Sequence, residues 1–469
     1  MRRATYQIGI VATRAVAAFV ACHHAAPQKP VEMVPIPSAS AAASNTLPSI
    51  TPVPADPGAL DEKENREIRK TLKIVAAVRG LQPKSEIPGK VLSRSALIAR
   101  VKDHVVAEVP AAAMTNEGLS YQLLGLLPAA GFDYVAESFR LLEAQLAGFY
   151  EPTDGSMYMA SDMDEEMSFA TLSHELVHGL QDQYWDLKTR SKWAAGRSDS
   201  LLAQSCLAEG DATSAMLDVM IKDSGHTAAD VPDSLLTPDM FLNADTTSVN
   251  TPHFMRASLI APYVEGLRFV HARRRATGGG FDGVNQAWDR TPTTTEQILH
   301  PDKWAAGEPA LMVASPPFAS LGKDFALVDQ DTFGELAVKL VFSEWMGETK
   351  APTFAANWGG DRTALVRKGD TTALAWLVRY DEAKGDPKPN RYASDAWLAL
   401  APAFALHFPP TVKEASFVCV ARRDAGPLAI ATKGRDILFL GGPTTVTAGA
   451  LTSAGDCALA KKWANEILK

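Results

Sequence analysis

A run of five residues places the strongest constraint on this chain, because it demands a helix with two histidines on one face. The run reads His174-Glu175-Leu176-Val177-His178. Histidines four positions apart lie one turn apart on the same side of an α-helix, so both imidazoles can reach one metal ion at about 2 Å. Glu175 lies beside the first histidine, where it can hold and deprotonate a metal-bound water without binding the metal. The run predicts two metal ligands and a general base, and about 0.01 such matches are expected by chance in this chain.

The residues around this run predict the structure that carries it. A helix is expected to begin at Asp162 or Asp164 and to continue to about Tyr184. Its apolar face would be formed by Phe169, Leu172, Leu176 and Leu180. Residues 147–161 contain two aromatic-containing segments on either side of Pro152-Thr153-Asp154-Gly155, a composition typical of a tight turn. We therefore expect a β-hairpin directly before the helix.

A catalytic zinc site usually has three protein ligands, so one more is expected outside this helix. Glu209 is the candidate, on a second helix predicted at 200–222 that could pack against the first. Its neighbours are mostly small and apolar, where a lone carboxylate is costly unless it is paired or bound to a metal. Asp211 competes with it as a ligand, or orients a ligating imidazole instead. Cys206 could also bind a metal, but a buried small hydrophobic residue is the simpler interpretation.

With these residues the chain resembles the gluzincin metallopeptidases, a thermolysin-like clan with His-Glu-x-x-His on one helix and a glutamate on the next. The resemblance covers about residues 147–215. It implies a zincin-like catalytic domain in which His174, His178 and Glu209 bind Zn²⁺. The second ligand helix of that clan often reads Glu-x-x-x-Asp, whereas Thr213 stands four residues after Glu209 here. The same stretch is also similar to a group of uncharacterised bacterial and archaeal envelope proteins of predicted zincin type.

The resemblance also implies how a substrate would be held. In zincins the strand before the active helix is an edge strand that pairs with an extended substrate. Ser156–Ala160 occupies that place and would bind a peptide by β-augmentation, unless it is an ordinary edge strand. Members of the clan stabilise the tetrahedral oxyanion with a Tyr or His from a later helix. Tyr263 is the candidate, since Tyr263-Val264-Glu265-Gly266 resembles the Tyr-x-x-Gly segment of some members, and His300 is its rival.

The charge and hydropathy of the chain narrow the classes of partner. The 469 residues include 46 Lys and Arg against 54 Asp and Glu, which gives a formal net charge of -8. Without a basic footprint, no nucleic-acid partner is expected. No run of 18 uncharged apolar residues occurs, so no internal transmembrane helix is expected. The oligomeric state is not determined by the sequence.

The N-terminal residues indicate an extracytoplasmic location. Residues 1–22 begin with a basic pair, continue through apolar and small residues and end at Cys22, which resembles a lipoprotein signal with a lipidated cysteine. Plain secretion and an ordinary N-terminal helix are the alternatives. Residues 23–58 are rich in Pro, Ala and Ser and contain no aromatic residue, so we expect a disordered linker. A lipid anchor followed by a linker would tether the folded body at the cell envelope.

The rest of the sequence predicts an α+β fold that is mostly helical. Residues 59–349 are assigned to the zincin-like domain, with further helices at 94–107, 118–127, 132–146, 258–276, 281–289 and 332–347. Residues 350–469 are assigned to a small C-terminal α+β subdomain, with strands at 364–368, 373–380, 416–422, 428–432 and 436–440 and helices at 394–407 and 456–468. Cys419 and Cys457 are expected to form a disulfide that joins the last helix to the sheet, and Cys206 is expected to stay free.

Three functions follow from these features. The first is a zinc metallopeptidase at the cell envelope, in which Glu175 activates zinc-bound water against a peptide or protein substrate. The second is a catalytically inactive zincin-fold binding or scaffold protein with a structural metal. The third is a metal-dependent hydrolase that acts on a non-peptide bond. The sequence determines neither the cleavage specificity nor the choice between endo- and exopeptidase action.

Overall fold

The computed structural model describes residues 62–163, 165–237, 251–447 and 449–469. The predicted signal at 1–22, with Cys22, and the predicted linker at 23–58 lie outside the described residues, as does Asp164. None of the helices in the described ranges is long and apolar enough to cross a membrane.

The structure is α+β, with about 51% helix and 18% strand, so the predicted mixed and mostly helical class is confirmed. The α-helices are α1 (Glu62–Arg79), α2 (Arg94–Glu108), α3 (Ala111–Leu123), α4 (Tyr134–Gln145), α5 (Glu165–Trp185), α6 (Leu187–Arg190), α7 (Ser198–Ile221), α8 (His253–Ala276), α9 (Asp282–Asp289), α10 (Thr295–Leu299), α11 (Pro301–Ala306), α12 (Gly334–Met346), α13 (Ala351–Ala355), α14 (Arg391–His407) and α15 (Cys457–Ile467). The strands are β1 (Gly89–Leu92), β2 (Gly148–Glu151), β3 (Ser156–Ala160), β4 (Ala326–Asp329), β5 (Trp358–Lys368), β6 (Thr371–Tyr380), β7 (Val412–Glu414), β8 (Phe417–Val420), β9 (Leu428–Lys433), β10 (Asp436–Thr447) and β11 (Ala450–Ser453).

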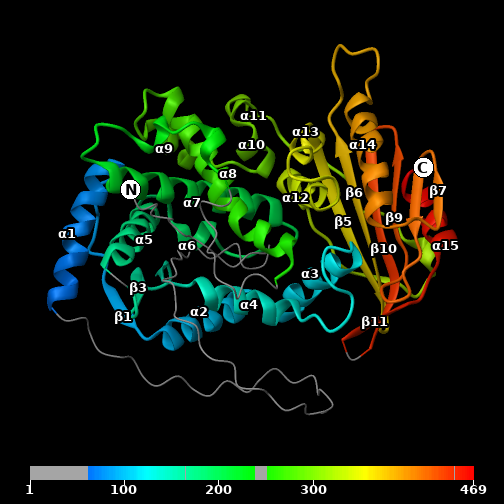
Figure 1. The fold of residues 1–469 in the computed structure, drawn as a ribbon, viewed down its shortest axis with the longest axis horizontal. Coiled ribbons are helices and arrows are strands. Elements are labelled where there is room, and N and C mark those ends of the chain that lie inside the picture. The colour runs from blue at the N-terminus through cyan, green and yellow to red at the C-terminus, as the bar shows by residue number, and fades with distance from the viewer. Residues whose placement is uncertain (1–61, 164, 238–250, 448) are drawn as a thin grey trace.

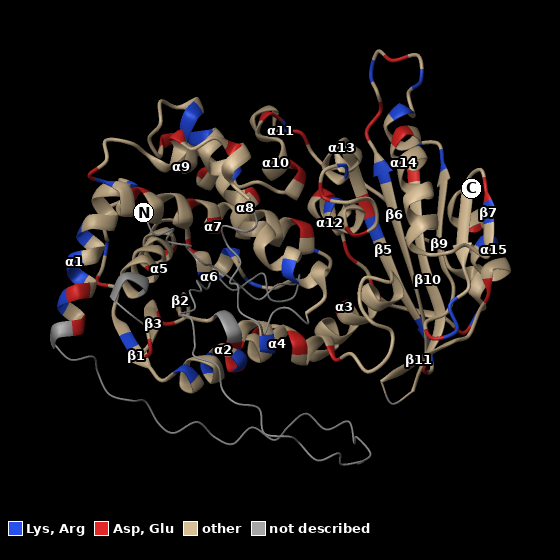
Figure 2. Ribbon diagram, viewed as in Figure 1, with Lys and Arg blue, Asp and Glu red and all other residues tan. Residues whose placement is uncertain are grey.

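The elements divide into a helical part and a sheet part that lie side by side (Figure 1). In the helical part, α5, α7 and α8 pack around a shared core, with α1 against α5 and α7. The interior of α7 is almost entirely small or apolar, which lets its neighbours approach closely. Charged residues of both signs occur along α1, α2 and α4, whereas the long strands of the sheet part carry few (Figure 2).

A three-stranded sheet lies against α5. The predicted hairpin is confirmed, because β2 and β3 pair antiparallel with Glu151 opposite Ser156. The prediction that Ser156–Ala160 is an edge strand is wrong, since the strand order is β1-β3-β2 and β3 is fully buried between its two neighbours. Strand β1, which the sequence did not reveal, pairs parallel to β3 and occupies the edge that was expected to receive a substrate.

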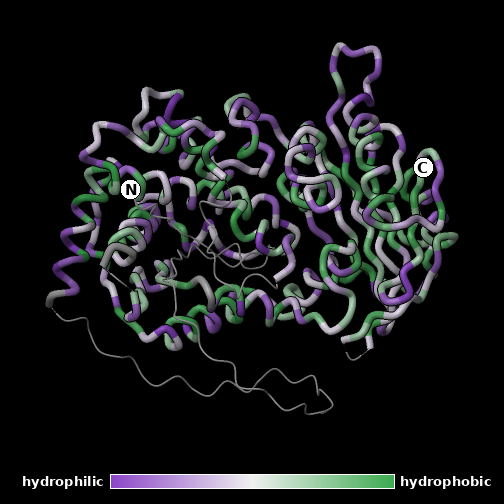
Figure 3. The backbone as a smooth tube through the Cα atoms, in the orientation of Figure 1, coloured by the Kyte–Doolittle hydropathy of each residue, from purple (hydrophilic) through white to green (hydrophobic). Residues whose placement is uncertain are grey.

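The sheet part is an eight-stranded antiparallel sheet with helices on both faces. The strand order is β4-β5-β6-β10-β9-β8-β7, with β11 paired to β10. Alternate residues of β6 point to opposite faces, so Leu374 and Trp376 pack in the core beneath α12 and α14 while Ala373 and Ala375 face α15. Both faces are covered, and the strands are accordingly hydrophobic along their length (Figure 3).

This sheet part draws on residues before the predicted boundary at 350. Strand β4 is its first strand, and α12 packs against β5. Residues of α3, far earlier in the chain, belong to the same core through Leu119 and Leu123. The helical and sheet parts therefore share a continuous interior across the predicted boundary.

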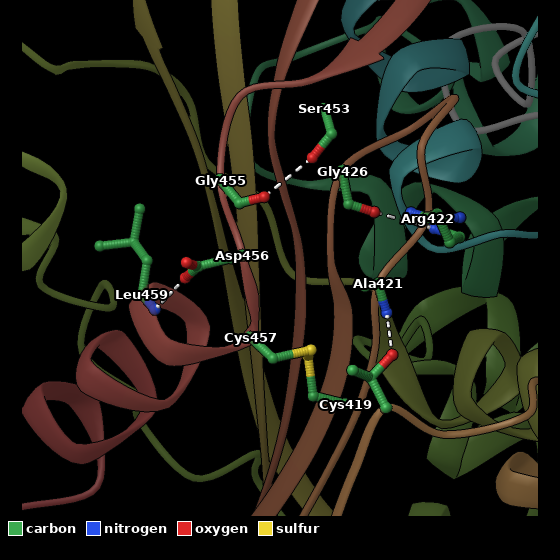
Figure 4. The surroundings of a disulfide bond; sticks show 10 residues. Cys419, Ala421, Arg422, Gly426, Ser453, Gly455, Asp456, Cys457 and Leu459 are labelled. Atoms are coloured by element: carbon green, nitrogen blue, oxygen red, sulfur yellow. Dashed lines mark hydrogen bonds between the residues drawn. A yellow bond between two sulfur atoms is a disulfide. The ribbon is translucent and has the colours of Figure 1, made fainter.

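The predicted disulfide is present in the structure. Cys419 of β8 and Cys457 at the start of α15 are bonded, with their Cα atoms 5.8 Å apart (Figure 4). Asp456 caps the same helix by accepting a hydrogen bond from the backbone N–H of Leu459. The disulfide therefore joins the last helix to the sheet, and Cys206 is free and buried, as expected.

Replacing both Cys419 and Cys457 by alanine should lower the free energy of unfolding by about 4 kcal/mol. The disulfide closes a loop of 38 residues, and chain-entropy estimates for such a loop give a value of this size. Denaturant unfolding of the parent and the double variant would measure the difference. A reductant should destabilise the parent and leave the double variant unchanged, and equal stabilities without reductant would contradict the prediction.

Candidate metal centre

Helix α5 turns the predicted metal-binding residues into the protein interior. Leu176, Val177 and Leu180 are completely buried in the core shared with α1 and α7. His174 and His178 are also completely buried, one turn apart on the side of α5 that faces α7. The two helices lie next to each other in the middle of the helical part (Figure 1). The helix predicted around the five-residue run therefore exists and delivers both imidazoles to one place.

The side chain of Glu209 on α7 completes a group of three ligand atoms. His174 Nε2 lies 2.9 Å from His178 Nε2 and 3.2 Å from Glu209 Oε2. His178 Nε2 lies 3.7 Å from the same oxygen. Ligand atoms around a tetrahedral zinc ion, each about 2.0–2.1 Å from it, lie about 3.3 Å from one another. The observed separations surround this value, so the three side chains form a candidate metal site.

The second carboxylate oxygen of Glu209 also indicates a metal site. Glu209 is 1% exposed, and its Oε1 atom is buried without a hydrogen-bond partner among the described residues. Buried carboxylate oxygens are normally satisfied by donors, because an unpaired charge in the interior is costly. Two neutral imidazole nitrogens and a carboxylate are the donor set that zinc prefers. The residues present therefore fit a zinc ion.

The charges of the group are mutually supportive in the metal-free protein. Burial disfavours the ionised carboxylate, but the hydrogen bond with His174 and the nearby imidazole of His178 outweigh it and lower the pKa of Glu209 to about 2. Burial alone would lower the pKa of His178, but the nearby carboxylates of Glu209 and Glu175 outweigh it and raise that pKa. The glutamate is therefore ionised and ready to bind a cation over the whole physiological range.

These pKa shifts predict opposite pH dependences without and with zinc. His178 contributes stability below its ordinary pKa of 6.5 and loses it as the pH rises through the higher folded value. Glu209 contributes stability above its ordinary pKa of 4.5 and loses it as the pH falls toward 2. The metal-free site should therefore stabilise the fold most between pH 4.5 and 6.5.

Zinc needs neutral imidazoles, so the rise in melting temperature on adding zinc should grow as the pH increases from 5 to 8. Thermal unfolding of the chelated and the zinc-loaded protein across this range would measure it. A zinc-induced shift that stays constant with pH would show that these histidines do not bind the metal.

Glu175 is held beside this group by the hairpin strand β2. Its Oε2 atom accepts a hydrogen bond of 2.7 Å from the backbone N–H of Tyr150, and the side chain is completely buried. The backbone of β2 therefore fixes the orientation of the carboxylate. Glu175 does not belong to the three-ligand group, which agrees with its predicted position beside the ligands.

Gln181 orients a ligating histidine, a role for which no carboxylate was found in the sequence. Thr213 stands where a supporting carboxylate was expected, and its hydroxyl is buried without a hydrogen-bond partner within the described ranges. His178 Nδ1 instead lies 2.8 Å from Gln181 Oε1, three residues along the same helix. Sequence reasoning missed this residue, although its spacing places it on the same face of α5 as the two histidines. The imidazole of His178 is therefore oriented from its own helix.

The two competing ligands have other partners. Asp211 accepts hydrogen bonds from Arg79 Nε at 2.6 Å and from Trp288 Nε1 at 2.9 Å. Its carboxylate thus forms a buried ion pair and is not a metal ligand in this arrangement. The alternative prediction, that Asp211 orients a ligating histidine, applies only indirectly, because Asp211 contacts Gln181 and not the imidazole. Cys206 is buried in the apolar core, and burial raises the pKa of its thiol well above its usual value. It is therefore a small hydrophobic residue here.

Of the two candidate oxyanion donors, Tyr263 lies next to the metal ligands. Its ring centroid is 6.4 Å from that of His174, and the side chain is completely buried in α8. His300 lies at the junction of α10 and α11, where Nε2 is 2.8 Å from Glu335 Oε1. Burial opposes protonation of His300, but the interaction with Glu335 outweighs it and raises the pKa of the imidazole. This pairing assigns His300 a structural role at that junction.

A second acidic group in the described residues already contains a cation. Glu296, Glu308 and Asp381 place carboxylate oxygens close together, and Lys303 Nζ lies between them at 2.5, 3.0 and 2.9 Å. Burial raises the pKa of Glu296 to about 8 despite this lysine. Because an ammonium group occupies the position that a metal would need, we interpret this group as an ion-pair cluster.

Comparisons with known proteins do not add an identity. No family model matches the chain, and neither a curated protein nor a solved structure does.

Proposed function

We propose that the chain is a zinc-dependent peptidase of gluzincin type. The observation that carries this proposal is the convergence of His174, His178 and Glu209 within the helical part, where one carboxylate oxygen of Glu209 has no hydrogen-bond partner in the part of the chain that the structure describes. Glu175 lies on the same helix, one residue from the first ligand, as a general base would.

A zinc ion, when bound, would acidify water and polarise a substrate carbonyl. The residues of the chain supply the proton transfers. The carboxylate of Glu175 would accept the proton of the attacking water and pass it to the leaving amine, so that one water and one peptide bond give a carboxylate and an amine. The Tyr150 N–H holds Glu175 in one orientation during these transfers. Tyr263 is proposed to donate a hydrogen bond to the oxyanion, which is supported by its position next to His174.

We further propose that the protein works at the cell envelope, anchored through Cys22 or secreted. The Cys419–Cys457 disulfide supports this location, because disulfides persist in oxidising compartments and are rare in the cytosol. Its substrate would accordingly be a peptide or protein outside the cytoplasm.

One observation favours the second candidate, a scaffold with a structural metal. His174, Glu175 and His178 are 0% exposed and Glu209 is 1% exposed. Structural zinc sites are closed, whereas catalytic sites keep a position open for water and substrate. Under the peptidase proposal, this site must open toward the solvent when a substrate binds.

Zinc analysis combined with a digestion assay separates the two candidates. The purified chain should contain about one zinc and hydrolyse a mixed peptide library, lose hydrolysis on chelation and regain it when zinc is restored. A His178→Ala variant should contain no stoichiometric zinc. A chain that binds one zinc and cleaves nothing supports the scaffold, and a chain without zinc rules out both.

A further inference from the structure

We infer that the buried ion pair between Arg79 and Asp211 sets the orientation of the Gln181 amide, and thereby the tautomer in which His178 offers Nε2 to a metal. Arg79 is the last residue of α1, and no sequence motif connects it with the metal-binding helix. The role is one of positioning, because Arg79 acts through two other side chains. The inference rests on the proposed metal site, but it can also be tested in the metal-free protein.

Asp211 serves only as a hydrogen-bond acceptor. Arg79 donates to it from Nε at 2.6 Å and from Nη2 at 3.1 Å, and both side chains are 0% exposed. Trp288 Nε1 donates to Oδ2 at 2.9 Å. Arginine and tryptophan side chains are donors without acceptor atoms, so the carboxylate faces donors on these sides.

Two acceptors determine the orientation of the Gln181 amide. The Nε2 atom of Gln181 lies 3.0 Å from Asp211 Oδ2 and 3.1 Å from the carbonyl oxygen of Ala208. Both partners are acceptors, so the amide must turn its NH₂ group toward them and its oxygen the other way. An amide flipped by 180° would place its oxygen against a carboxylate and a carbonyl, which is unfavourable in the interior.

The orientation of the Gln181 amide determines which nitrogen of His178 carries the proton. The Gln181 oxygen lies 2.8 Å from His178 Nδ1, and an amide oxygen can only accept, so Nδ1 carries the proton. A neutral imidazole protonated at Nδ1 has its lone pair on Nε2. That nitrogen is the one that faces His174 and Glu209. The orientation of a metal ligand is thus determined from α1, through α7 and back to α5.

The chain contains a matched pair that can serve as a control. Arg274 of α8 donates to Asp218 Oδ2 at 2.6 Å, and Asp218 lies on α7 seven residues after Asp211. The guanidinium groups of Arg79 and Arg274 both lie over the ring of Phe281, at 4.6 and 4.2 Å from its centroid. The other oxygen of Asp218 accepts from the backbone N–H of Ala228 and not from a glutamine that contacts a ligand. Breaking this pair should perturb stability without reaching the metal site.

The experiment compares Asp211→Asn with Asp218→Asn. Asparagine at 211 can present its own NH₂ group to Gln181, which weakens the preference for one amide orientation and leaves the carbonyl oxygen of Ala208 as the remaining acceptor. Long-range ¹H–¹⁵N spectra of the metal-free protein, recorded at a pH where His178 is neutral, report which imidazole nitrogen carries the proton, and competition with a chelator gives the zinc affinity. We expect a single Nδ1–H tautomer of His178 in the parent and in Asp218→Asn. In Asp211→Asn we expect a mixed or changed tautomer and a zinc affinity about ten- to a hundred-fold lower.

A second variant covers the case in which Asp211→Asn does not fold. Gln181→Met keeps the Arg79–Asp211 pair and the side-chain volume, and should lower the zinc affinity to a similar extent. A metal-free parent with the His178 proton on Nε2 would overturn the inference. So would zinc affinities of Asp211→Asn or Gln181→Met equal to that of Asp218→Asn. If the parent binds no zinc, the proposed function fails, while the tautomer in the parent and the variants still decides the inference.

Discussion

Replacing Glu175 by glutamine should lower peptide hydrolysis by about a hundred- to ten-thousand-fold and leave zinc in place, since a positioned general base typically contributes a factor of this size. The amide is nearly isosteric with the carboxylate, and its oxygen can still accept the hydrogen bond from the Tyr150 N–H. The amide can hold a water molecule but cannot take its proton. Because Glu175 is not one of the three ligand residues, the zinc content should stay at one per chain.

The measurement is the digestion rate of a peptide library by the parent and the Glu175→Gln variant at equal zinc content. His178→Ala is the matched control, because it removes a ligand and should lose zinc and hydrolysis together. A parent and a Glu175→Gln variant that cleave at the same rate would show that the chemistry assigned to this helix is wrong. A parent that does not cleave, with Glu175→Gln unchanged in every respect, is the result that the scaffold candidate predicts.

The local patterns of the sequence predicted much of the helical framework. Apolar residues at helical spacing identified α5, a second helix was predicted at the place of α7, and the spacing of His174 and His178 put both imidazoles on one side of α5. Glu209 was found because a lone carboxylate among small apolar residues needs a partner. The structure brings all three together, although they come from two helices, α5 and α7. These inferences depend on one residue and its close neighbours in the chain, which a sequence displays directly.

Features that depend on partners distant in the sequence were not predictable in this way. Strand β3 was expected at a sheet edge, but it is central because β1 pairs with it. Strand β1 has four residues and begins at Gly89, 67 positions before the first residue of β3, Ser156. A short strand of this kind has no clear alternation. The imidazole of His178 is likewise supported through Gln181, Asp211 and Arg79. The last two residues of this series are in contact although they lie 132 positions apart in the chain. Position in the chain gives no signal for such contacts.

The crossing of α7 and α8 shows how glycines bring the site together. Gly210 follows the ligand Glu209, and Gly266 lies three residues after Tyr263. A Cβ atom added to Gly210 would lie 2.2 Å from the backbone carbon and oxygen of Gly266. A Cβ atom added to Gly266 would lie 2.0 Å from the backbone oxygen of Cys206. The two helices therefore touch backbone to backbone at the level of Glu209 and Tyr263, so the Tyr-x-x-Gly segment has a packing reason.

Gly266→Ala should therefore lower the free energy of unfolding by about 2 kcal/mol, the net of overpacking and helix propensity, and weaken zinc binding. Alanine favours a helix by about 1 kcal/mol over glycine, so any loss must come from the contact with Cys206. That contact involves backbone atoms on both sides, which cannot rotate away as a side chain can, and overpacking of this kind typically costs about 1–3 kcal/mol, occasionally more. The helices must separate, which shifts α7 or α8 and disturbs the position of Glu209 relative to the histidines on α5. Denaturant unfolding with zinc chelated, followed by zinc titration, would measure both effects. Gly280→Ala is the control, because no atom of the described residues beyond its chain neighbours lies within 4 Å of its added Cβ. If Gly266→Ala is as stable as Gly280→Ala and binds zinc as tightly, the close crossing of α7 and α8 does not hold the ligands in place.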